Sequence, residues 1–238
     1  MSFVERNSFK GSPFSNRHVC TYFIDIAIYL AVMFWIREVY FPELNFITNG
    51  LFWSFTTLFL AVIIMRIRGI SWREVGLCKS ESNKRLISAT VFIFAFSIIS
   101  IVVFQMVKDS YGLQIAPDQS NQQAASKFGD LSGNWPLFFS LLPFIWLQSA
   151  LEEILDRGFL INLIERALNS TWFATFVAVL AQAIIFGFRH SGDLSERSIT
   201  VGLIGLAMGI GYVAFGRNLW PLIIAHCGLN TMSMLDRV

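Results

Sequence analysis

Four ionisable side chains crowd into the eight-residue stretch LEEILDRG, residues 151–158. Glu152, Glu153, Asp156 and Arg157 follow an apolar run that begins near Trp135. Within a segment long enough to cross a bilayer such groups are costly, and they usually face the interior of a helix bundle, where they pair or react. Carboxylates in that setting are candidates for general acid–base chemistry.

Helical spacing gives the two adjacent glutamates different surroundings. Residues four apart share a helix face, so Glu153 lies over Arg157, which neutralises it. Glu152 points about 100° away, on a stripe with Gln148 and Asp156, and it lacks a local cation. A glutamate left unpaired in this way is suited to act as a general base or acid. Asp156 either acts on Glu152 by like charge or faces water, and the sequence leaves both options open.

Two of the three histidines stand at helix positions with informative neighbours. His190 follows Phe186 by four residues in FGFRH, and His226 precedes Asn230 by four in HCGLN. Each imidazole therefore shares a helix face with its companion. His18, the third histidine, lies in the polar N-terminal segment. Without the histidines, residues 151–158 are equally consistent with an ion-pair cluster at the headgroup level.

The helices that carry these residues must bring them to one depth. Glu152 and His190 each lie roughly 28 Å from the turn at Ser170, measured along antiparallel helices at 1.5 Å per residue. His226 lies only a few residues past the turn at 216–218, which simple alternation places at the same end as Ser170. The depths agree if the hairpin around Ser170 projects beyond that turn. Its tip is polar enough to project, with Asn162, Glu165, Arg166, Asn169 and Ser170.

Composition places the chain in the membrane class. Of 238 residues 55% are hydrophobic and only 14% are charged, whereas a soluble domain carries about a quarter charged residues. The net charge is +2 and the basic residues cluster in loops, so we expect a lipid bilayer and no nucleic acid as a partner. We expect an integral protein of a plasma (inner) membrane of bacterial or archaeal type.

The hydropathy pattern predicts an all-α, polytopic transmembrane bundle of about seven spans, within a range of six to eight. The predicted spans are residues 21–36, 51–65, 86–107, 135–150 continuing as helix to about 168, 172–188, 199–215 and 220–235. Residues 1–18 are a polar tail, and residues 19–134 hold membrane helices and a polar loop at 108–134. The loop at 66–85 carries six basic residues, which predicts a cytoplasmic location. Gly205 and Gly209 form a GxxxG that allows close helix approach.

Three motifs occur in order on predicted membrane helices: EExxxR at 152–157, FxxxH at 186–190 and HxxxN at 226–230. This arrangement resembles the CPBP family of intramembrane proteases, also called the CAAX-protease and bacteriocin-processing or Abi family, to which the eukaryotic Ras-converting CAAX endopeptidase belongs. The resemblance covers about residues 136–235. It implies that residues 135–238 are a catalytic unit, whereas the first three spans match only as membrane helices.

The resemblance also implies roles for the motif residues. Glu152 and His190 would activate a water, and His226 and Asn230 would stabilise the oxyanion. Glu153, Arg157 and Phe186 would be supporting residues of the active site, which agrees with the division between the glutamates made above. Family members commonly carry a bulky apolar residue where this chain has Asp156. The substrate would be a peptide or protein, membrane-anchored or not.

Three alternatives stay open at this point. A glutamate and two histidines are legitimate zinc ligands, but the helices lack the HExxH spacing of zinc peptidases, so we expect no metal and no cofactor. The chain could instead be a non-catalytic scaffold or immunity protein of the same fold. A transporter would use Asp25, Glu152 and Glu153 as pathway charges, yet the chain shows no internal repeat of the kind that many transporters have.

Overall fold

A computed structural model describes residues 16–80, 82–116 and 128–238, with the backbone alone at 16–19. The described chain is helical and contains no strand, which confirms the all-α prediction. Its helices are α1 (Asn16–Trp35), η2 (Ile36–Glu38), α2 (Phe46–Arg68), α3 (Asn83–Ser110), α5 (Trp135–Glu152), η3 (Glu153–Leu160), α6 (Ile161–Ala167), α7 (Trp172–Ser191), α8 (Glu196–Ala214) and α9 (Trp220–Leu235).

Helix ends follow local sequence signals. Thr171 accepts a hydrogen bond from the Ala174 backbone N–H and so caps the start of α7, after the predicted turn at 169–171. Gly192 ends the same helix at a φ of 73°, a left-handed conformation that glycine adopts without strain. Pro221 lies in the first turn of α9, where a missing N–H costs nothing.

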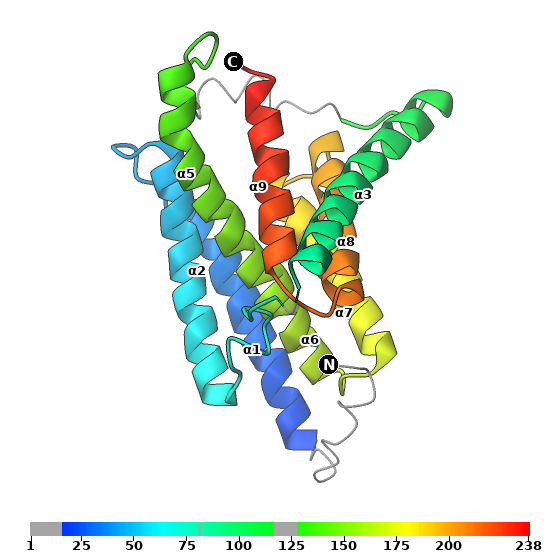
Figure 1. Cartoon of the computed structure of the whole chain (residues 1–238). Coiled ribbons are helices and arrows are strands. Elements are labelled where there is room, and N and C mark those ends of the chain that lie inside the picture. Colours follow the sequence, from blue (N-terminus) through cyan, green and yellow to red (C-terminus); the bar gives the residue numbers. More distant parts are fainter. Residues whose placement is uncertain (1–15, 81, 117–127) are drawn as a thin grey trace.

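The long helices alternate in direction through the bundle. In Figure 1, α1, α3, α7 and α9 rise, while α2, α5 with α6, and α8 descend. Among the described residues six helical segments are long and apolar enough to span a membrane. The remaining helix, α9, has 16 residues and carries two of the predicted site residues, His226 and Asn230. The seven predicted spans therefore all correspond to helices, with α9 the short one.

Three boundaries differ from the predictions. Helix α1 begins at Asn16, inside the predicted 1–18 tail, and residues 1–15 lie outside the described part of the chain. Helix α3 extends to Ser110, into the predicted 108–134 loop, of which residues 117–127 are likewise outside it. The predicted uninterrupted α-helix from 135 to 168 changes its winding at Glu153. Residues 153–160 form a π-helix, whose hydrogen bonds reach five residues back and which is frequent at functional sites.

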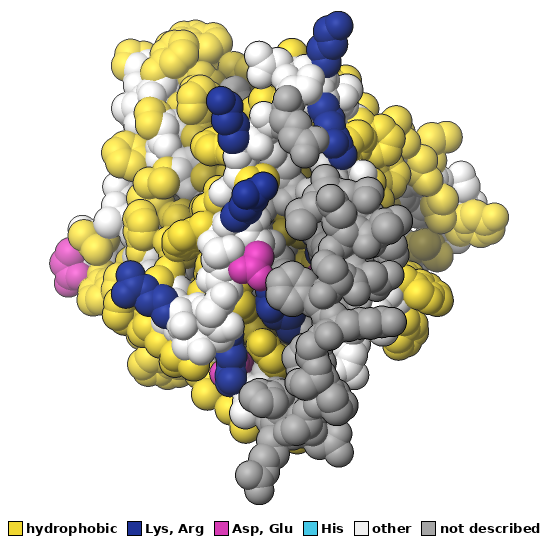
Figure 2. All heavy atoms as spheres, turned by 60° about the horizontal axis from the view of Figure 1, so that its bottom comes forward, with side chains coloured by type: hydrophobic (Ala, Val, Ile, Leu, Met, Phe, Trp, Pro, Cys, Tyr) yellow, Lys and Arg dark blue, Asp and Glu magenta, His cyan; other side chains and the backbone are white. Residues whose placement is uncertain are grey.

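One end of the bundle carries the exposed basic side chains. They lie at the end of α2, in the segment that follows it or at the start of α3: Arg66, Arg73, Lys79, Lys84 and Arg85. Figure 2 looks toward this end and shows Lys and Arg side chains gathered on it. These residues lie within the 66–85 segment for which the positive-inside rule predicts a cytoplasmic location.

Glycines bring α7 and α8 into close contact. A Cβ added to Gly187 would lie 2.3 Å from the backbone oxygen of Ser198, so only glycine fits. A Cβ on Gly205 would lie 3.4 Å from Ala183 Cα, and one on Gly209 would lie 3.0 Å from Val179 Cγ1. The predicted GxxxG thus serves packing between helices of the same chain.

The hairpin between α6 and α7 projects past the start of α9, as the depth argument requires (Figure 1). Arg217, in the turn between α8 and α9, binds both carboxylate oxygens of Glu165 in α6, at 2.6 and 2.7 Å. The α8–α9 turn therefore lies level with α6, and the turn at Ser170 lies beyond it. This offset brings His226 to the depth of the glutamates.

Candidate active site

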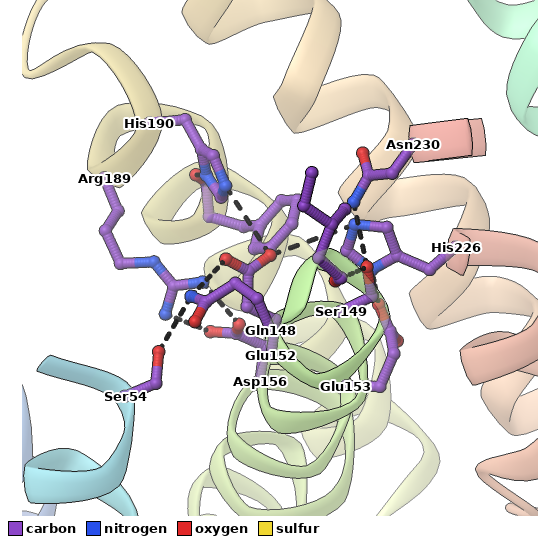
Figure 3. Close-up of polar contacts among 12 residues, drawn as sticks. Ser54, Gln148, Ser149, Glu152, Glu153, Asp156, Arg189, His190, His226 and Asn230 are labelled. Carbon is purple, nitrogen blue, oxygen red and sulfur yellow. Dashed lines mark hydrogen bonds and ion pairs between the residues drawn. The ribbon is translucent and has the colours of Figure 1, made fainter. Parts of the chain in front are cut away.

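Three helical segments converge on Glu152, the last residue of α5 (Figure 3). Its Oε2 atom lies 3.6 Å from Nε2 of His190 in α7 and 3.9 Å from Nε2 of His226 in α9. The Glu152 side chain is 10% exposed, that of His190 20% and that of His226 8%. The structure therefore gathers one carboxylate and two imidazoles in a largely buried place.

The second oxygen of Glu152 has a neutral partner. Gln148 Nε2 donates to Glu152 Oε1 at 3.1 Å and to Ser54 Oγ of α2 at 2.8 Å. An amide one turn earlier thus orients the carboxylate, and α2 steadies the amide. Oε2 is left facing the two imidazoles.

Backbone and aromatic contacts fix His190. Its Nδ1 lies 2.7 Å from the carbonyl oxygen of Phe186, and a carbonyl can only accept, so Nδ1 carries the hydrogen. In the neutral ring the lone pair is then on Nε2, the atom that faces Glu152. The Phe186 ring lies 4.4 Å from the imidazole, measured between centroids. The FxxxH spacing therefore sets both the tautomer and the orientation of this histidine.

Glu153 lies at the centre of a separate, fully buried ion pair. Its Oε1 accepts from Arg157 Nη1 at 2.9 Å and lies 2.7 Å from His226 Nδ1. The Glu153 and Arg157 side chains are both 0% exposed. The Arg157 guanidinium stacks 4.1 Å from the Phe186 ring centroid, a favourable cation–π distance. The predicted pairing of Glu153 with Arg157 is present, and it extends to His226.

Asn230 contacts α5 one turn along α9 from His226. Its Nδ2 donates to Ser149 Oγ at 2.9 Å, and Ser149 passes its own hydrogen to the Ile145 carbonyl oxygen. An amide nitrogen has two hydrogens, so this bond leaves Asn230 one donor for a substrate. Both members of HxxxN therefore face α5, as their spacing predicts.

Asp156 does not face water, and its charge is not free to act on Glu152. Its side chain is 0% exposed and forms a two-pronged ion pair with Arg189, at 3.1 Å from Nη1 and 2.7 Å from Nη2. Sequence reasoning missed Arg189, although it directly precedes the motif histidine. A membrane-depth arginine requires an anionic partner, and Asp156 was the acid with no assigned role. That pairing was the available clue.

The donor set has the composition of a zinc site. Glu152, His190 and His226 offer an oxygen and two nitrogens, which zinc accepts. In the described parts of the chain, however, no group of three or more His, Cys, Asp or Glu side chains is spaced to hold a metal ion. The atoms that face one another stand 3.6–3.9 Å apart.

The turn between α7 and α8 lies one residue beyond His190. Hydrogen bonds from the Ser195 side chain and backbone lower the pKa of the exposed Asp193 carboxyl in this turn. Arg197 Nε meets the His190 carbonyl oxygen at 3.4 Å. His190 therefore lies next to an exposed, charged turn at one end of α7.

Comparison with known proteins agrees with this geometry. Residues 134–232 match the family model described as type II CAAX prenyl endopeptidase Rce1-like. The matched segment contains every motif residue, from Glu152 to Asn230. Neither the curated proteins nor the solved structures contain a match to this chain.

Proposed function

Because this chain, through residues 134–232, belongs to the family of type II CAAX prenyl endopeptidase Rce1-like membrane proteases, we propose that it is an intramembrane glutamic endopeptidase. Its substrate would be a membrane-associated protein or peptide. The observation that carries the proposal is the approach of His190 Nε2 and His226 Nε2 to the same oxygen of Glu152, at 3.6 and 3.9 Å.

Glu152 and His190 are spaced to hold a water between them. Their facing atoms are too far apart for a direct hydrogen bond, whereas a water about 2.8 Å from each fits that separation. Glu152 takes a proton from this water as the oxygen attacks the peptide carbonyl. The same proton then passes to the leaving amine nitrogen when the C–N bond breaks, so that the carboxylate is regenerated.

His226 and Asn230 supply donors for the negative charge that develops on the carbonyl oxygen. His226 already uses Nδ1 toward Glu153, so donation to the oxyanion would come from Nε2, with a hydrogen on both ring nitrogens. Asn230 donates through its second amide hydrogen. Loss of one such donor typically slows turnover by about 10²–10³-fold.

We propose that the reaction needs no metal. Glu152 is oriented by Gln148 and flanked by two imidazoles, which gives it the surroundings of a base. The experiment is turnover by purified protein in excess chelator, with zinc added back. Retained activity supports the glutamic mechanism, whereas loss that zinc restores would identify the site as a zinc peptidase.

The substrate follows from a comparison of membranes. Proteomics of membrane and released peptides, wild type against Glu152→Ala and His190→Ala, should reveal peptides that appear only with the wild type. A quenched CAAX peptide, prenylated and unprenylated, then tests whether a lipid anchor is required. A cellular function that survives both substitutions, with the protein inserted and folded, would favour the scaffold or immunity alternative.

The transporter alternative depends on Asp25. That carboxylate binds Arg68 Nε at 2.5 Å in a pair between α1 and α2, which gives it a packing role. Flux through reconstituted vesicles that depends on Asp25 would revive this alternative. For location, we propose a plasma membrane of bacterial or archaeal type, with lipid as the surrounding partner.

A further inference from the structure

Two ion-pair rungs join the same pair of helical segments. Glu152, at the end of α5, and Asp156, in η3, lie one helical turn apart. Glu152 faces His190 and Asp156 faces Arg189, and these two partners are consecutive residues of α7. Figure 3 shows both rungs side by side. Because Arg189 and His190 are neighbours in the chain, a contact that fixes the backbone at Arg189 also fixes the position of His190.

The Asp156–Arg189 rung is the rigid one. Both nitrogens of the guanidinium fork meet both oxygens of the carboxylate, and the side chains are 0% and 3% exposed. Such a fork fixes distance and angle more tightly than a single hydrogen bond does. The Glu152–His190 rung, at 3.6 Å, has no direct bond to hold it. The distance between Glu152 and His190 is therefore set by the neighbouring Asp156–Arg189 ion pair.

Helix α1 and the short helix η2 hold the same turn from the other side. Arg37 Nη1 donates to the backbone carbonyl oxygen of Arg189 at 3.0 Å. That carbonyl belongs to the last turn of α7, where carbonyls lack partners within the helix and a cation is favourable. Met33 Sδ also lies 3.6 Å from Arg189 Nη1. Arg37 and Met33, which lie outside the segment 134–232, thus contact the residue that precedes His190.

We propose that Asp156, Arg189 and Arg37 form a positioning device that holds the end of α7 so that His190 Nε2 faces Glu152. The α1–η2 segment, through Arg37, is thereby part of the site. Asp156, the departure from the family pattern, has its reason here, because it is the acid that Arg189 requires. This inference rests on the proposed water-activating role of Glu152 and His190.

The test is removal of both charges together. Replacing a buried ion pair with apolar side chains of similar size is often tolerated by the fold, so Asp156→Leu with Arg189→Met keeps a folded protein. We expect kcat on the quenched peptide to fall about 10–100-fold, the loss that a displacement near 1 Å produces. KM should stay within about twofold, since neither residue is assigned to substrate. Arg189→Lys, with Asp156 kept, should have a kcat between those of the wild type and the double variant, because lysine cannot form the two-pronged ion pair.

Two further variants keep the result unambiguous. Arg37→Met leaves the ion pair intact and should still lower kcat, by about tenfold, through movement of the α7 end. The matched control is Asp25→Leu with Arg68→Met, which removes the ion pair between α1 and α2 and should leave kcat unchanged. A wild-type kcat in the Asp156/Arg189 double variant, or a loss seen only in KM, would overturn the positioning role.

Loss of the catalytic role of Glu152 and loss of the positioning role can be told apart. If Glu152→Gln retains turnover, the proposed function itself is wrong. If Glu152→Gln is inactive while the Asp156/Arg189 and Arg37 variants turn over as the wild type does, only the positioning role is wrong. Heating curves of every variant in detergent show whether a lower kcat reflects lost folded protein, and a kcat loss that follows unfolding counts against the inference.

Discussion

Changing each of the two adjacent glutamates to glutamine should have different effects on thermal stability and on turnover. Glu153 is 0% exposed and serves both Arg157 and His226 through one oxygen. Removing its charge strands the Arg157 cation, whose Nε and Nη2 already lack hydrogen-bond partners. Breaking a buried pair in this way costs about 3–5 kcal/mol. At roughly 2–4 °C per kcal/mol for a chain of this size, Glu153→Gln should unfold about 6–20 °C lower than the wild type.

Glu152→Gln is the matched control for that change. Its hydrogen-bond partner is the neutral Gln148 and it pairs with no arginine, so an isosteric amide should alter stability by less than about 1 kcal/mol. It should nevertheless abolish turnover, because an amide cannot take the proton. The assay is the fraction of monodisperse protein that survives heating in detergent, measured beside peptide cleavage. Equal unfolding temperatures for the two variants would refute the division between a neutralising and a reacting glutamate.

Three further predictions concern the frame of the site. Gly187→Ala places a Cβ 2.3 Å from a backbone oxygen, so it should lower the free energy of unfolding by about 1–3 kcal/mol and should lower kcat. In Gly50→Ala the added Cβ meets Gln148 Oε1 at 4.0 Å, an ordinary contact, so stability and kcat should both stay unchanged. Asn230→Ala should lower kcat by about 10²-fold with KM nearly unchanged; a wild-type kcat would remove it from the oxyanion site. In a background without native cysteines, Lys79→Cys should react with an impermeant thiol reagent only in inverted vesicles, and labelling from outside intact cells would reverse the assigned orientation.

Much of this architecture follows from helical periodicity. Contacts within one helix depend only on spacing, so Glu153–Arg157 and Phe186–His190 could be predicted from the sequence. The seven helices followed from apolar runs between turn residues. That His226 lies at the same depth as Glu152 could be predicted only if the hairpin at Ser170 projects beyond the 216–218 turn. How far a hairpin projects depends on tertiary packing.

The individual ion pairs between helices outside the motifs could not be predicted from the sequence. Asp156 and Arg189 lie 33 residues apart, and their meeting depends on how α5 and α7 are rotated about their axes. The π-helix at 153–160 also changes that rotation after Glu152, which an expectation of uniform α-helix cannot include. Arg37 lies still further away in sequence, in a part of the chain for which no motif drew attention.

Three carboxylates and three guanidinium groups gather at the site. Glu152, Glu153 and Asp156 are accompanied by the arginines at positions 37, 157 and 189. In the proposed reaction the proton passes from the water to Glu152 and then to the leaving nitrogen, within a site whose facing atoms lie 3.6–3.9 Å apart, about a tenth of a hydrocarbon layer that is roughly 30 Å thick. One charge crossing the whole layer is worth about 2.3 kcal/mol per 100 mV, so this step would feel only about 0.3 kcal/mol. We therefore expect peptide cleavage in reconstituted vesicles to proceed at nearly the same rate with and without a membrane potential.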